Sequence, residues 1–212
     1  MSLPTIEVVY RPGTEAFRAK PKDASFVKPA FDILSQQKGQ LQKFFGLQHE
    51  DKTSAYVIVA WEDLEDHKRL MNDTETYPRL GAAVGSFFDV TAKAPQNMVH
   101  VRPTSDPFKA FEAPVTEIAY FTLKAGTSKD AGEQLIDTLS KAMIAAGSAD
   151  GVVHSAWGPV VEKDNVIALF IGWTSVDAHH KAISANTTLA GLITQLRAAF
   201  EVDLVHVEFT AA

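Results

Sequence analysis

The sequence predicts an α+β protein in which one structural unit occurs twice along 212 residues. Three observations predict this fold class: an internal repeat, a proline-rich interruption between the two copies, and the same order of strand and helix patterns in each copy. A repeated unit can bury an uncovered apolar face against its own copy, so the repeat favours two packed units over two independent domains.

The internal repeat is seen when residues 23–90 are aligned with residues 135–202, which needs no gap. Trp and His are rare, with three and seven in the chain, yet both types recur at matching points. Allowing a small change of offset for the first and last strands, the matched pairs are Trp61 with Trp173, His67 with His179, Glu7 with Glu117, Tyr10 with Tyr120, and His100 with His206. We therefore predict a tandem duplication.

The two copies are separated by residues 103–114, which contain three prolines and no sustained periodicity. Such a composition is typical of a linker, because proline removes a backbone donor and restricts the residue before it. It sets the expected boundaries: a first unit at residues 1–102, a tether running outside at 103–114, and a second unit at 115–212.

Each copy has the order strand, helix, strand, strand, helix, strand. In the second copy we predict a strand at 115–123, a helix at 129–146, strands at 151–161 and 166–173, a helix from residue 175, and a strand at 203–209. The first helix follows from Leu135, Leu139 and Met143, which share one helical face. The second follows from Ser175, a typical N-cap, with Asp177 in the first turn. Polar residues between the two middle strands predict a hairpin.

This order of elements is the split βαβ, or ferredoxin-like, motif. Its two helices cover only one face of the sheet, so the other face needs a partner. Residues 166–173 are apolar at positions on both faces, which agrees with burial of both. The sequence thus predicts two ferredoxin-like βαββαβ units forming an intrachain pseudo-dimeric α+β barrel, either as a monomer or as a homodimer of such chains.

Composition excludes several functions. The chain has no cysteine, which excludes disulfides, thiolate nucleophiles, iron–sulfur clusters and cysteine zinc sites. The net charge of -6 comes without a cluster of Lys and Arg, so no nucleic-acid partner is expected. The apolar runs are too short to cross a membrane, and the first residues lack the pattern of a secretory signal. We expect a cytoplasmic protein.

Residues 172–179, Gly-Trp-Thr-Ser-Val-Asp-Ala-His, form a motif at a strand end and helix start, and residues 61–67 are a weaker version. Together with the strand at 115–119, this motif resembles the dimeric α+β barrel superfamily, especially its antibiotic-biosynthesis-monooxygenase-like (ABM-like) and stress-responsive A/B barrel domains. The resemblance covers nearly the whole chain. Members of this superfamily include cofactor-free oxygenases, polyketide cyclases, haem-handling enzymes and proteins without known activity. The resemblance implies that this chain belongs to one of these groups. Members often carry a first-strand histidine where Glu7 and Glu117 stand here.

His67 and His179 lie inside apolar stripes of predicted helices, each six residues after the tryptophans Trp61 and Trp173. We interpret these four residues as a structural motif, in which each histidine packs and finds a polar partner. The alternative is that the two histidines take part in function.

His100 and His206 lie in the last strands, on the face opposite the flanking valines. If the valines meet the helices, both histidines point into the barrel. There an imidazole can act as general base toward an acidic phenol or enol, so both are candidate catalytic residues. The alternative is a solvent-facing position on an edge strand.

Ligand contacts are predicted from polar and aromatic strand residues. The candidates are Glu7, Tyr10, Tyr56, Glu117, Tyr120, Trp157 and Phe170. A carboxylate on a sheet face must be solvated or paired, so either glutamate can orient a histidine or lie at an edge. The aromatic residues can line a cavity or fill the core.

We predict no metal site and no cofactor. No His-x-x-x-His or Glu-x-x-His spacing, dinucleotide fingerprint or P-loop occurs. The main hypothesis is a protein that binds a small apolar or aromatic molecule in the barrel, as a cofactor-independent monooxygenase or polyketide-cyclase-like enzyme. The alternatives are a non-catalytic stress-response or ligand-binding protein, and a haem-handling protein. Divergence between the copies predicts that only one half keeps an open pocket.

Overall fold

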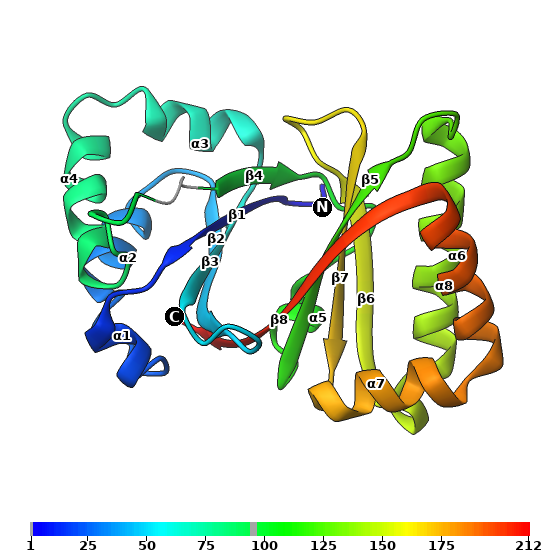
Figure 1. Cartoon of the computed structure of the whole chain (residues 1–212). Coiled ribbons are helices and arrows are strands. Elements are labelled where there is room, and N and C mark those ends of the chain that lie inside the picture. The colour runs from blue at the N-terminus through cyan, green and yellow to red at the C-terminus, as the bar shows by residue number, and fades with distance from the viewer. Residues whose placement is uncertain (1, 94–96) are drawn as a thin grey trace. The chain divides into compact units, whose positions relative to one another are not determined.

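The structure is a computed structural model that describes residues 2–93 and 97–212. The chain divides into two compact units (Figure 1). Unit 1 comprises Met1–His100 with Thr210–Ala212, and unit 2 comprises Val101–Phe209.

The described residues of unit 1 form four strands, and helices follow the first and third of them. The elements are β1 (Thr5–Pro12), α1 (Glu15–Ala19), α2 (Lys28–Leu34), β2 (Gln40–Gln48), β3 (Ser54–Trp61), α3 (Leu64–Met71), α4 (Thr76–Ala83), the short 3-10 helix η1 (Val84–Ser86) and β4 (Asn97–Val101). The strand order is β4-β1-β3-β2, and β3 pairs antiparallel with both β1 and β2.

Unit 2 repeats this order after one additional short helix. The elements are α5 (Phe108–Phe111), β5 (Val115–Leu123), α6 (Lys129–Ala146), the 3-10 helix η2 (Gly147–Asp150), β6 (Val152–Pro159), β7 (Val166–Trp173), α7 (Val176–Ala185), α8 (Thr187–Ala199) and β8 (Phe200–Ala211). The strand order is β8-β5-β7-β6, with β5 antiparallel to both β7 and β8.

Both units therefore have the βαββαβ order of the ferredoxin-like motif, which confirms the predicted α+β fold class. In unit 2, β5, α6 and β7 have the predicted bounds, and β8 extends beyond the predicted strand at both ends. Ser175 caps α7 as expected, its side chain accepting a hydrogen bond from the Ala178 amide at 3.0 Å. Within residues 2–93 and 97–212, no helix is long and apolar enough to span a membrane.

The apolar core of each unit lies between its helices and one face of its sheet. In unit 2, Ala119 and Phe121 alternate onto this face of β5 and pack with Leu139 of α6 and Leu196 of α8. Burying each large side chain of this kind contributes about 1.5–3 kcal/mol. The core of unit 1 is more aromatic, and its members include Phe17, Phe31, Phe45, Trp61, Phe87 and Phe88.

The segment expected to run outside as a tether is instead packed on unit 2. Residues 103–114 include α5, which lies against β6 and β7. Phe111 of α5 is only 1% exposed, and its ring packs on Phe170 of β7 at a centroid distance of 4.9 Å. The prolines stop a long helix from forming, but the apolar residues between them form one short helix whose burial fixes the segment.

Candidate functional site

Glu7 occupies the middle of β1, on the face of the sheet that the helices cover. Because side chains alternate between the two faces of a strand, Glu7 and Val9 lie on the same face, and Val9 belongs to the core of unit 1. Glu7 is only 6% exposed, although desolvating a carboxylate is costly unless the group is paired. The indole Nε1 of Trp61 donates a hydrogen bond of 2.8 Å to Glu7 Oε2. The two residues are diagonal neighbours, because Trp61 is the register partner of Thr5.

The junction between β3 and α3 fixes the position of His67. Trp61 is the last residue of β3, and Asp63 caps α3 by accepting a hydrogen bond from the Asp66 amide at 3.0 Å. One helical turn later, the His67 ring stacks on the Trp61 indole, with centroids 5.0 Å apart and an interplanar angle of 11°. The spacing between Trp and His in the motif is thus set by a strand end, a cap and one turn.

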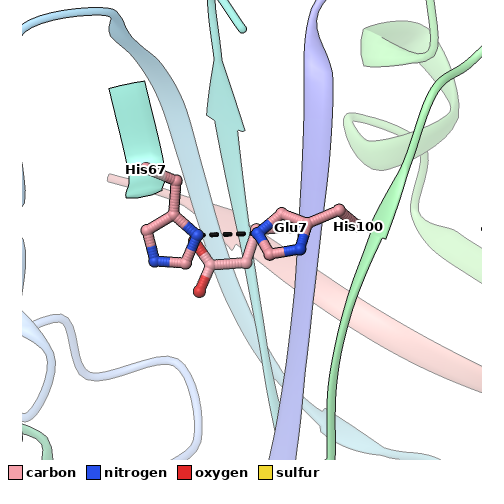
Figure 2. A group of neighbouring side chains, drawn as sticks. All are labelled: Glu7, His67 and His100. Atoms are coloured by element: carbon pink, nitrogen blue, oxygen red, sulfur yellow. Dashed lines mark hydrogen bonds and ion pairs between the residues drawn. The ribbon is translucent and has the colours of Figure 1, made fainter. Parts of the chain in front are cut away.

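His100 of β4 completes the cluster. Its Nε2 lies 2.7 Å from His67 Nδ1, and His67 Nδ1 lies 3.5 Å from Glu7 Oε2. Figure 2 shows the three side chains pointing toward one another. They are brought together because β4 is the neighbour of β1 in the sheet and α3 follows β3. Glu7, His67 and His100 are called the unit 1 triad below.

Unit 2 contains the same arrangement, the unit 2 triad of Glu117, His179 and His206. Trp173 Nε1 donates to Glu117 Oε2 at 2.8 Å, and the Trp173 ring stacks on His179 with centroids 4.8 Å apart. His179 Nδ1 lies 2.8 Å from His206 Nε2 and 3.6 Å from Glu117 Oε2. His206 and Glu117 are direct register partners on β8 and β5. The corresponding contacts of the two triads therefore agree closely.

The two imidazoles of each triad share one proton along their N···N contact. A neutral imidazole has one N–H and one bare nitrogen, so one ring donates to the other. The carboxylate of each triad lies 3.5–3.6 Å from the helix histidine, so an imidazolium formed there would have an opposite charge beside it. Such a pair can accept a proton from a bound molecule and hold it as imidazolium, which is the task of a general base.

The unit 1 triad borders a cavity between the sheet and helices α2 and α4. The cavity volume is about 310 Å³, and Glu7 and His67 form part of its wall. Its apolar wall includes Phe31, Leu34, Val59, Leu80, Phe87 and Met98. Tyr77 and Arg11 add polar groups. Burial, and then the charge of Glu7, raises the pKa of the Tyr77 phenol, so this hydroxyl remains a donor.

The unit 2 triad borders a larger cavity, between its sheet and helices α6, α7 and α8. This cavity has a volume of about 690 Å³ and includes Glu117 and His179 in its wall. Lys124, Arg197 and His180 also line it, and Lys124 Nζ donates to the backbone oxygen of Arg197 at 2.7 Å. Among the described residues of this wall, Glu117 is the only acidic one. The cavity of unit 2 therefore suits an anionic ligand better than that of unit 1.

The structure corrects the predicted placement of the four histidines. We interpreted His67 and His179 as packed residues with a polar partner, and we expected His100 and His206 to point into the barrel or to solvent. Each strand histidine instead contacts the helix histidine of its own unit. The premise that the valines of the last strands meet the helices is wrong. Met98, which shares a strand face with His100, lines the unit 1 cavity on the helix side. Each strand histidine therefore lies on the sheet face that carries the buried glutamate of its unit.

The predicted ligand contacts divide between the two faces of the sheets. Glu7 and Glu117 line the cavities. Strand alternation places on the opposite faces Tyr10, Tyr56, Tyr120 and Phe170. Trp157 belongs to the core of unit 2 and donates to Asp137 Oδ1 at 3.3 Å. None of the five aromatic candidates is among the described residues that line the two cavities.

The number of pockets differs from the prediction. Divergence between the copies predicted one open pocket, but both units contain a cavity, and the two cavities differ in size and in the residues of their walls.

The donor atoms of a possible metal site also differ from the prediction. The sequence predicted no metal site, but each triad brings two imidazole nitrogens and a carboxylate oxygen within 4.8 Å of one another. The three groups come from three separate elements, so no short sequence spacing reveals them.

Sequence reasoning did not assign the remaining polar residues of the cavity walls to a site, namely Arg11, Tyr77, Lys124, His180, Ser184 and Arg197. A signal was available for one of them: Arg11 follows Glu7 and Val9 at the strand period of two, so it shares their face. The others depend on how helices pack, which strand periodicity does not give.

Comparisons with known proteins identify the fold. No protein-family model matches the sequence, and no curated protein matches it. A candidate monooxygenase structure from Fusobacterium nucleatum has 13% identity and a TM-score of 0.68, and the match covers 99% of this chain and 94% of that one. One from Lactobacillus acidophilus has 13% identity and a TM-score of 0.64, covering 100% and 96%. An anthrone oxidase-like protein has 11% identity and a TM-score of 0.67, covering 100% and 94%. At these identities the likeness shows the fold alone.

Proposed function

We propose that this chain, which has the fold of the ABM-like dimeric α+β barrel superfamily, is a monooxygenase-like protein that binds a small apolar or aromatic molecule and takes a proton from it. The molecule binds in the cavities between sheet and helices, and the triads accept the proton. One observation carries the proposal: an imidazole pair, 2.7 Å apart and buried in unit 1, 2.8 Å apart and partly buried in unit 2, stands beside a carboxylate in the wall of a largely apolar cavity.

The cavities favour a ligand with aromatic rings and one weakly acidic position. Small-molecule sites commonly have volumes of about 300–1,000 Å³, apolar walls and a few polar groups that fix orientation. Both cavities have this character, with volumes of about 310 and 690 Å³. The names of the similar structures support the same class, since they include candidate monooxygenases and an anthrone oxidase-like protein. Anthrone is a fused aromatic ketone with an acidic CH2 group.

The proposed reaction uses the triad as base and molecular oxygen as oxidant. An imidazole takes one proton from the CH2 group, and the electron pair left behind delocalises into the carbonyl as an enolate. The negative charge of Glu7 or Glu117 stabilises the imidazolium that forms. The enolate adds oxygen to give a peroxide anion, which takes the proton back from the imidazolium and becomes a hydroperoxide. The O–O bond of the hydroperoxide then breaks, and its terminal OH leaves with the remaining hydrogen of that carbon as water. In total, CH2 and O2 become C=O and H2O, so carbon is oxidised, oxygen is reduced, and no other reductant is needed.

The experiment uses anthrone as the probe, first without oxygen to measure binding and then with oxygen to measure its consumption. The wild type should bind and turn over. The double variant His100→Gln with His206→Gln should bind with similar affinity but lose turnover by about 10²–10⁴-fold, the usual contribution of a general base. His49→Gln is the matched control, because His49 lies in the turn after β2 beside Lys52 and should leave turnover unchanged.

Two results would contradict the proposal. Full turnover by the double variant would show that the triads take no part in the reaction. Binding of the probe without any turnover by the wild type would leave a ligand-binding protein and overturn the enzymatic part.

A further inference from the structure

We infer that each triad is also a binding site for one divalent transition-metal ion, held by two imidazole nitrogens and one carboxylate oxygen. The two sites are Glu7, His67 and His100 in unit 1, and Glu117, His179 and His206 in unit 2. The inference goes beyond the proposed function and does not rest on it, because the ion binds without any organic ligand.

The donor atoms already have separations close to those an ion requires. Metal–ligand bonds of about 2.0–2.2 Å place neighbouring donors about 3.0–3.6 Å apart. In unit 2, the separations among His179 Nδ1, His206 Nε2 and Glu117 Oε2 are 2.8, 3.6 and 4.0 Å. In unit 1, His67 Nδ1 lies 2.7 Å from the ring nitrogen of His100 and 3.5 Å from the Glu7 carboxylate. An ion between the rings therefore requires only a small rotation of the side chains.

The chemistry of the donors selects the class of ion. Two imidazoles with one carboxylate suit zinc, cobalt, nickel and non-haem iron(II), whereas magnesium and calcium prefer sites made of oxygen atoms. The chain has no cysteine, so no thiolate competes for the ion. A divalent ion would also balance the charge of a buried glutamate, which is 6% exposed in unit 1 and 5% in unit 2.

Groups around the triads hold the donors in place. Trp61 Nε1 donates to Glu7 Oε2 and the Trp61 ring stacks on His67, while Trp173 makes the same contacts in unit 2. Metal sites typically have such outer contacts, which orient the ligating carboxylates and rings. The arrangement is present twice, although the two cavity walls have diverged. The same contacts therefore hold the donor atoms in both units.

Three protein donors leave coordination positions for a further ligand. Glu7 and His67 line the unit 1 cavity, and Glu117 and His179 line the unit 2 cavity. The remaining positions of a bound ion would therefore face these cavities, where water or an oxygen atom of a bound molecule can occupy them. Three ligands with an open position are typical of catalytic rather than structural metal sites.

The test is the binding of cobalt(II) to chelator-treated protein, followed by visible absorption and by equilibrium dialysis with metal analysis. The wild type is expected to bind two ions per chain. His100→Gln and His206→Gln should each bind one, and the double variant none. His154→Gln is the matched control, because its ring contacts the backbone oxygen of Asp106 at 2.8 Å and belongs to neither triad, and it should retain two.

No binding by the wild type, or two ions retained by the double variant, would overturn the inference. Circular dichroism checks the fold of each variant, and Glu7→Gln and Glu117→Gln replace any that fails to fold, each with the expected loss of one ion. The stoichiometry decides the inference whatever the turnover result. An ion on the ring nitrogens should block proton transfer to them, so absence of turnover in the metal-free protein overturns the proposed function alone.

Discussion

Unit 1 and unit 2 share their triads but not their cavities. The imidazole nitrogens are 2.7 and 2.8 Å apart, and the indole-to-carboxylate hydrogen bond is 2.8 Å in both units. The cavities have volumes of about 310 and 690 Å³, with Tyr77 and Arg11 in one wall and Lys124 and Arg197 in the other. The geometry of a triad depends on a few local features, namely the end of a strand, the cap of a helix and the register between neighbouring strands. A cavity wall depends on many side chains, so it can change while the chemistry beside it stays the same.

The largest expected effect is on turnover by single variants. His100→Gln should remove most turnover of neutral anthrone, and His206→Gln little of it, because the less charged cavity of unit 1 suits a neutral ligand better. The loss should approach the 10²–10⁴-fold contribution of a general base, about 3–5 kcal/mol in activation free energy. Oxygen consumption by the two variants measures it. Equal losses would show that the two cavities do not discriminate.

A smaller effect is expected on stability from the tryptophans that pair with the glutamates. Trp61→Phe and Trp173→Phe remove an N–H from a buried carboxylate, so each should lower the free energy of unfolding by about 1–3 kcal/mol. Trp157→Phe is the matched control with a smaller loss, since its partner Asp137 is partly exposed and 3.3 Å away. Urea denaturation measures the free energy of unfolding of the three variants. Unequal losses at Trp61 and Trp173 would contradict the equivalence of the triads.

Gly39 and Gly151 occupy matching positions, in the loop before the second strand of each unit. Gly39 and Gly151 have φ of 78° and 80°, in the left-handed region, and a Cβ there would meet the Asp66 side chain or Ala178 Cβ. Alanine at either position should cost about 1–2 kcal/mol in strain, plus the crowding. Gly126, with φ of 90° and no heavy atom within 4 Å of a built Cβ, is the control for strain alone. Thermal melts that rank Gly126→Ala as the most destabilising would contradict this.

The smallest expected effect is on the titration of Tyr77. Burial and the charge of Glu7 raise the pKa of its phenol, so the folded state favours the neutral form. This contribution to stability is present below the ordinary tyrosine pKa and is lost as the pH rises through the raised value. Glu7→Gln should lower the pKa of Tyr77 toward its ordinary value. Absorbance titration against Tyr77→Phe measures it, and an unchanged or higher pKa would contradict the assigned cause.

The fold could be predicted from the sequence because it depends on local patterns. The bounds of β5, α6 and β7 follow from periodicity, turns and caps. The contact between His67 and His100 could not be predicted. The alternation of side chains along a strand shows which residues share a face, but it does not show which face meets the helices. Tyr77 and the cavity walls were missed for a related reason: they depend on how helices sit on the sheet.

The central claim is that the triads take a proton from a molecule bound beside them. Anaerobic exchange of the anthrone CH2 hydrogens in heavy water tests this step apart from oxygen chemistry. The metal-free wild type should exchange these hydrogens faster than buffer alone, and the double variant His100→Gln with His206→Gln should exchange them at the rate of buffer while still binding the probe. Exchange at the buffer rate by wild-type protein saturated with anthrone would contradict the claim.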